Sequence, residues 1–122
     1  MIGINDLKIG KPITYITANQ IAIIKRIKQV SPKTKIIMQS TLPVNEKMLA
    51  TIYKRLNNAD IDLMNNALKK ACAALNVTYV NLHTVLTDDD EQLQKELSTD
   101  GLHLKPGAYV KWVGLLKSLK LL

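Results

Sequence analysis

Asp100 and His103 are the residues whose types and spacing most directly suggest chemistry. An imidazole accepts a proton and returns it near neutral pH, and it does so best when a carboxylate orients one of its nitrogens. A separation of three residues across a turn lets Asp100 reach back to His103, and Gly101 supplies the backbone freedom that such a turn needs. The spacing therefore predicts an acid–base pair that activates a nucleophilic hydroxyl. The alternative is that Asp100 only caps a turn and that His103 is an ordinary surface residue.

Other residues with chemical potential fit structural roles better. Cys72 lies in the run Lys-Lys-Ala-Cys-Ala-Ala-Leu, which is typical of a helix and favours a small buried hydrophobe over a catalytic thiol. His83 is interpreted as structural. The acidic run 88–91 has the wrong spacing for a calcium loop, and we interpret it as the cap and first turn of a helix over 88–97. We therefore expect no metal site.

The elements that must position the acid–base pair alternate between strands and helices. Strands are expected at residues 1–4, 35–41 and 77–82, and helices at 17–30, 46–56, 60–75 and 106–121. This order predicts an α/β fold with a parallel sheet and helices on both faces. Chemistry is then expected at the carboxyl ends of the strands, where Asn5 follows the first one. The inward face of the last helix is expected to carry Val110, Val113, Leu116 and Leu119.

The sequence at both ends of the chain resembles known motifs. Thr99-Asp100-Gly101-Leu102-His103-Leu104, followed by Pro106-Gly107, is similar to the last conserved block of the SGNH, or GDSL-type, hydrolases. Gly3-Ile4-Asn5-Asp6 resembles the Gly-x-Asn-Asp block of the same family. Between them, residues 32–45 resemble the fourth strand and following loop of bacterial acylhydrolases of this group. The resemblance covers essentially the whole chain, in order.

This resemblance implies a serine ester hydrolase (an acylhydrolase, lipase or acetylesterase) that uses no metal or organic cofactor. His103 would act as general base and then as acid, Asp100 would orient it, and Asn5 would donate to the oxyanion. Taken alone, Asn5 is better interpreted as a turn residue. The implied substrates are esters of acylated carbohydrates or lipids. The alternative function is a non-catalytic binding or assembly module that retains the hydrolase fold.

The family's nucleophile lies in an N-terminal Gly-Asp-Ser block, which has no counterpart in these 122 residues. The resemblance therefore implies the C-terminal portion of a flavodoxin-like, three-layer α/β/α domain. We expect one domain over residues 1–122, with the parallel sheet reduced to about three strands. The isolated chain is expected to be inactive, because none of its serines lies on a tight strand-to-helix turn. Absence of the family's first strand would expose an edge of the sheet, so we expect self-association through that edge.

Charge and composition argue against several other classes of protein. The net charge of +7 comes from 17 basic and 10 acidic residues, but the lysines are spread along the chain and aromatic residues are few. We therefore expect no nucleic-acid partner, which would need clustered basic and stacking side chains. No apolar run approaches the ~20 residues of a membrane span. The first residues do not form a signal-peptide pattern, and the sequence does not indicate a compartment.

Overall fold

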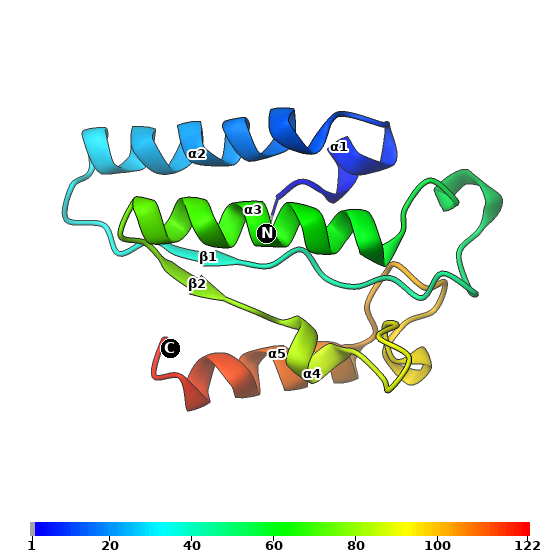
Figure 1. The fold of residues 1–122 in the computed structure, drawn as a ribbon. Helices are drawn as coiled ribbons and strands as arrows, with labels where there is room; N and C mark the ends of the chain where they lie inside the picture. The colour runs from blue at the N-terminus through cyan, green and yellow to red at the C-terminus, as the bar shows by residue number, and fades with distance from the viewer. Residues whose placement is uncertain (1) are drawn as a thin grey trace. The chain divides into compact units, whose positions relative to one another are not determined.

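The computed structural model describes residues 2–122, which form short strands and longer helices (Figure 1). The elements, in chain order, are α1 (Ile4–Lys8), α2 (Ile13–Val30), β1 (Ile37–Gln39), the 3₁₀ helix η1 (Thr51–Tyr53), α3 (Asn58–Ala74), β2 (Thr78–Val80), α4 (His83–Leu86), the 3₁₀ helix η2 (Lys95–Leu97) and α5 (Pro106–Ser118). They fall into two compact units. The first unit consists of two segments, the chain up to Thr41 and Ala59–Val80. The second consists of Leu42–Asn58 and Asn81–Leu122. The expectation of one domain over residues 1–122 stays a prediction.

The first unit contains the parallel sheet that the alternating pattern predicts. β1 and β2 run in the same direction and are joined along the chain by α3 (Figure 1). Met38 lies opposite Tyr79, and the Ser40 N–H donates to the Val80 carbonyl at 2.9 Å. Both strands are shorter than expected, and β1 is half-buried instead of buried on both faces. The class of fold is therefore confirmed as α/β with a small parallel sheet.

The core of the first unit lies between the sheet and two helices. Ile24 from α2 packs with Leu68 and Cys72 from α3, and all three side chains are buried. This burial confirms the interpretation of Cys72 as a core residue, and desolvation raises the pKa of its thiol. Hydrophobic side chains that flank and form the strands complete the cluster, namely Ile36, Met38, Val77 and Tyr79, together with Leu75. The buried faces of α2 and α3 therefore meet in this core.

The strand expected at residues 1–4 is wrong for the residues that the structure describes, and Met1 lies outside them. Ile2 and Gly3 are not in a strand, and Ile4 begins α1. Gly3 has a φ of 128°, a conformation that interrupts an extended chain and that glycine adopts without steric cost. Within the described residues the sheet therefore has two strands instead of about three.

The second unit contains more irregular chain than the sequence pattern predicts. The helix expected at 46–56 is reduced to η1, and the helix expected at 88–97 is replaced by turns and η2. The Asp88 side chain accepts hydrogen bonds from the backbone N–H groups of Asp90 and Gln92, each at 3.0 Å. An aspartate that bonds nearby backbone in this way competes with helix formation, so the acidic run closes a turn instead of starting a helix.

The expected inward face of α5 is also wrong in part. Val110, Val113 and Leu119 are 73%, 40% and 49% exposed, whereas Leu116 is buried as expected. The buried side of the helix carries Ala108 in addition, and α5 packs against α4. Apolar residues occupy more than one side of this helix, so its periodicity does not identify the buried side. Among the described residues, no helix is long and apolar enough to span a membrane.

Candidate active site

The acid–base pair lies on a closed turn that precedes α5. Ser98 and Leu104 form an isolated antiparallel bridge, and the Lys105 N–H donates to the Leu97 carbonyl at 2.8 Å. The five residues between the bridged positions form a loop with its ends held together. Asp100 and His103 therefore project from one short, internally bonded segment.

The structure brings Asp100 and His103 together as their spacing predicts. The Asp100 Oδ2 atom lies 2.6 Å from His103 Nδ1, while Asp100 Oδ1 accepts the backbone N–H groups of His103 at 2.8 Å and Leu102 at 3.0 Å. An ionised carboxylate only accepts hydrogen bonds, so Nδ1 must carry the proton of this contact. The other ring nitrogen, Nε2, is then the atom that can take a proton from a reacting hydroxyl.

Hydrogen bonding keeps the Asp100 carboxylate ionised. Burial acts to raise the pKa of Asp100, but hydrogen bonds from the backbone and side chain of His103 and from the backbone of Leu102 outweigh it. The net effect lowers the pKa of Asp100 from 3.8 to about 2. Asp100 is therefore a carboxylate across the neutral range and can stabilise the imidazolium form of His103 during proton transfer.

The imidazole of His103 is accessible from solvent. Its side chain is 65% exposed, whereas that of Asp100 is 35% exposed. The Tyr53 ring meets the imidazole edge to face, with ring centroids 6.2 Å apart and an interplanar angle of 73°. This contact gives the ring a second neighbour besides the carboxylate.

Replacing Gly101 with any other residue would strain the turn. Its φ of 84° lies in the left-handed region, and a Cβ there would lie 2.5 Å from the Asn45 carbonyl oxygen. The Asn45 N–H in turn donates to the Gly101 carbonyl at 2.8 Å. The sequence predicts the flexibility of Gly101, but the close approach of Asn45 comes from tertiary structure.

Asn5 lies in the first unit, near the start of α1, whereas Asp100 and His103 lie in the second. Its side chain is exposed, as a group must be to reach a ligand. The turn before it depends on Gly3, because a Cβ at that position would lie 3.0 Å from the Ile16 side chain. The role of Asn5 as an oxyanion donor stays a prediction.

The chain contains four serines, at positions 31, 40, 98 and 118, and the structure describes each of them. The Ser31 hydroxyl bonds that of Thr34, and the Ser118 hydroxyl donates to the Leu115 carbonyl. Ser40 is buried in the first unit, and Ser98 bonds the backbone of the histidine turn. Ser118 ends α5, about 20 Å along the helix from its start after His103.

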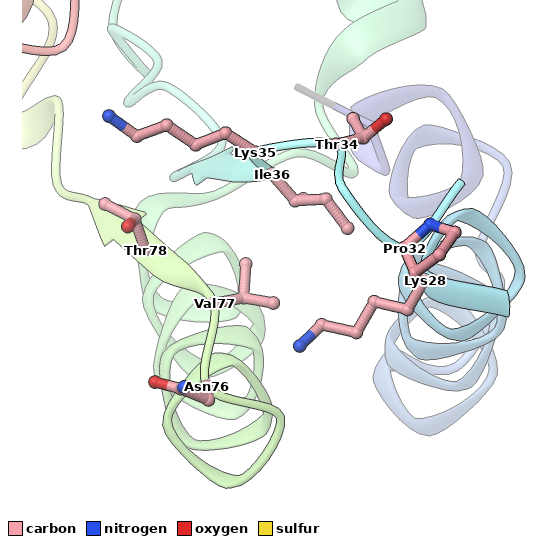
Figure 2. A pocket seen from close by; sticks show the side chains of 8 residues that line it. All are labelled: Lys28, Pro32, Thr34, Lys35, Ile36, Asn76, Val77 and Thr78. Atoms are coloured by element: carbon pink, nitrogen blue, oxygen red, sulfur yellow. The ribbon is translucent and has the colours of Figure 1, made fainter.

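A hollow of about 400 Å³ lies in the first unit, where the chain enters β1 and β2 (Figure 2). The Lys28 side chain donates to the Leu75 carbonyl at 2.6 Å. Figure 2 shows the Lys35 side chain extending away from Lys28 and Val77. Ligand sites of parallel α/β sheets lie at the opposite, carboxyl ends of the strands. This hollow is therefore a poor candidate for the active site. No group of three or more His, Cys, Asp or Glu residues that could hold a metal ion occurs within residues 2–122.

Comparison with known proteins places these residues in a family. The sequence profile of the GDSL-like lipase/acylhydrolase family matches residues 1–110, which include Asn5, Asp100 and His103. The chain belongs to this family. No curated protein matches the sequence.

Solved structures agree with membership of the GDSL-like family. A structure from Streptococcus pneumonia whose name refers to platelet activating factor is 34% identical, with a TM-score of 0.90, over 98% of this chain and 56% of that one. A GDSL-like lipase from Bacteroides thetaiotaomicron is 19% identical, with a TM-score of 0.73, over 90% of this chain and 53% of that one. The esterase domain of a zebrafish retrotransposon protein is 19% identical, with a TM-score of 0.63, over 90% and 60%. The chain thus spans little more than half the length of each structure.

Sequence reasoning missed the residues that hold the turn of this GDSL-like chain in place. Ser98 bonds across the turn, Asn45 bonds Gly101, and Tyr53 meets the imidazole. A serine three residues before a glycine is a weak signal for the first of these contacts. The other two join distant parts of the sequence and leave no local signal.

Proposed function

We propose that this chain carries the acid–base pair of a serine-type carboxylic ester hydrolase. The observation that supports the proposal most directly is the 2.6 Å contact between Asp100 Oδ2 and His103 Nδ1, which leaves Nε2 available on an exposed ring. Membership of the GDSL-like lipase/acylhydrolase family supports the same chemistry. The proposed substrates are esters of acylated carbohydrates or lipids.

In the proposed reaction, His103 Nε2 takes the proton of a serine hydroxyl while the serine oxygen attacks the ester carbonyl carbon. The side-chain amide of Asn5 donates to the oxygen that becomes negative in the tetrahedral intermediate. His103 then gives its proton to the departing alcohol, and an acyl-enzyme remains. Water, deprotonated by His103, attacks this acyl group, and His103 returns that proton to the serine oxygen as the acid leaves. Asp100 stays ionised throughout and holds the imidazole in its Nδ1–H form.

The serine of this reaction is proposed to come from a Gly-Asp-Ser segment encoded upstream of Met1. The hydrogen bonds of the Ser31, Ser98 and Ser118 hydroxyls and the burial of Ser40 support this assignment. The 122-residue chain by itself is then expected to show no triad-type ester hydrolysis.

The test compares two proteins in a p-nitrophenyl acetate assay. One is the 122-residue chain, and the other is the product of the same reading frame extended upstream through a Gly-Asp-Ser segment. We expect turnover only by the extended protein. In that protein, His103→Ala should lower kcat by about 10⁶-fold, Asp100→Asn by about 10⁴-fold and Asn5→Ala by about 10²–10³-fold.

Two results would contradict these proposals separately. An extended protein that folds but hydrolyses no ester would refute the proposed activity. Turnover by the 122-residue chain that disappears in His103→Ala would refute the proposal that the nucleophilic serine is encoded upstream. A reading frame without a Gly-Asp-Ser segment upstream would refute the same proposal.

We also propose that the 122-residue chain associates with a second copy through the edge of its sheet. In the described residues the sheet has two strands, so each strand has an outer edge. An edge strand presents N–H and C=O groups that another chain can pair with.

A further inference from the structure

Ser98 stands at the base of the turn that carries the acid–base pair, and its side chain is completely buried. Its hydroxyl oxygen accepts the Gly101 N–H at 2.9 Å. The same hydroxyl donates to the carbonyl of His103 at 2.8 Å. One side chain therefore bonds both the residue that follows the acid and the backbone of the base.

These two bonds and the contact between Asp100 and His103 form in the same turn of the chain. The carboxylate reaches Nδ1 only if the chain folds back over three residues, and that fold is the one in which Gly101 and His103 both meet the Ser98 hydroxyl. The Thr99 N–H donates to the same His103 carbonyl at 3.4 Å, a longer contact. Without the hydroxyl, the Gly101 N–H would lose its acceptor, and the His103 carbonyl would keep only the longer contact with the Thr99 N–H.

We propose that Ser98 is a positioning residue for the Asp100–His103 pair, holding the turn in the geometry that keeps the imidazole in its Nδ1–H form. The catalytic meaning of the inference rests on the proposed function. Ser98 is not proposed as a nucleophile, because its hydroxyl is buried and engaged at both its oxygen and its proton.

The experiment measures the imidazole tautomer in the 122-residue chain. Long-range ¹H–¹⁵N NMR spectra at about pH 8.5, where a free imidazole is neutral, distinguish the Nδ1–H form from the Nε2–H form. The Nδ1–H form is expected to dominate for His103 in the wild-type chain. In Ser98→Ala this dominance should be lost, and in Ser98→Thr, which keeps a hydroxyl, it should be largely restored.

Two controls separate this positioning role from a general loss of packing. Ser40→Ala removes the hydroxyl of a second fully buried serine, in the first unit, and should leave the His103 spectrum unchanged. His83, the other histidine of the chain, is an internal reference in every spectrum. If Ser98→Ala does not fold, Ser98→Cys, which keeps the volume but bonds weakly, replaces it and should also weaken the Nδ1–H preference.

The inference is overturned if a folded Ser98→Ala or Ser98→Cys chain keeps the wild-type tautomer of His103. It is also overturned if Ser40→Ala changes that tautomer as much as Ser98→Ala does. Because the readout is geometric, it does not depend on ester hydrolysis. A wild-type pair in the Nδ1–H form without esterase activity in the extended protein would refute the proposed function and leave the role of Ser98 intact.

Discussion

At the scale of single residues, the Asp100 carboxylate accepts three hydrogen bonds from its immediate neighbours in the chain. Two come from backbone N–H groups, and the third comes from the ring of His103. All three form within a few residues, so the acid needs no distant segment to become a strong acceptor. This local bonding makes Asp100 both an orienting group and a contributor to stability.

The pKa of Asp100 predicts a pH-dependent contribution to folding. Because its pKa falls from 3.8 to about 2, the ionised form is favoured in the folded chain, and the stabilisation is fully present above about pH 4. It is lost as the pH falls through about 2. Thermal unfolding followed by circular dichroism should therefore give a lower Tm for Asp100→Asn than for the wild type at pH 6, with a difference that shrinks toward pH 2. A difference that is the same at both pH values would contradict this account. Solvent screening keeps the effect small, since the side chain is 35% exposed.

Two glycines predict opposite effects of the same substitution. Gly101→Ala forces a side chain into a left-handed backbone and against the Asn45 carbonyl, and should lower the free energy of unfolding by ~2 kcal/mol or more. Gly114→Ala, in the interior of α5 with nothing within 4 Å of the new Cβ, should raise it by ~0.5–1 kcal/mol. Chemical denaturation of both variants checks the pair. Equal effects would show that the close contact at Gly101 does not constrain the fold.

At the scale of elements, α5 demonstrates how periodicity can mislead. The helix contains valine, leucine and tyrosine on several sides, and its exposed side includes Tyr109, Val110 and Val113. A hollow lined by these residues with Gly114 and Lys117 lies on this side. The buried side instead carries Ala108 and Leu116. The choice between two apolar sides is made by what packs against the helix.

Truncating one side chain on each side of α5 should distinguish them. Leu116→Ala leaves a cavity under the helix and should lower the free energy of unfolding by ~2–4 kcal/mol. Val110→Ala removes a side chain that is 73% exposed and should change it by less than ~0.5 kcal/mol. Urea unfolding of the two variants provides the measurement. A larger loss for Val110→Ala would mean that the opposite side of the helix is covered in solution.

At the scale of the whole molecule, the chain combines a small sheet with many exposed apolar side chains. Within residues 2–122, twelve large hydrophobic residues have more than a third of their surface exposed, including Ile52, Val110 and Leu122. Together with the outer edges of β1 and β2, these side chains are the basis for the proposed self-association of the chain.

Sedimentation velocity provides the test of self-association. We expect the 122-residue chain to form dimers or larger species at micromolar concentration, with a weight-average mass that rises with concentration. Moderate salt should not dissociate these oligomers, because strand pairing and apolar contacts are less sensitive to screening than surface ion pairs. A stable monomer at micromolar concentration would contradict the proposal.

By itself, the sequence determined the features that depend on near neighbours. The three-residue separation of Asp100 and His103 predicts their contact, because a short turn is enough to make it. The apolar period predicts α2 and α3, and the alternation of elements predicts a parallel pair of strands. These features follow from local geometry and from the need to bury one side of each element.

Only the tertiary structure decided the features that depend on distant segments. The close fit of Gly101 against Asn45 joins two loops, and the exposed position of Val110 depends on which side of α5 is covered. The acidic run at 88–91 closes a turn, and the chain directly after it is joined to a distant loop, because the Leu93 N–H donates to the Val44 carbonyl at 3.1 Å. Local propensity does not separate this turn from helix capping. Long-range packing selects among such locally acceptable states. In the turn that carries Asp100 and His103, such a long-range contact joins Asn45 and Gly101.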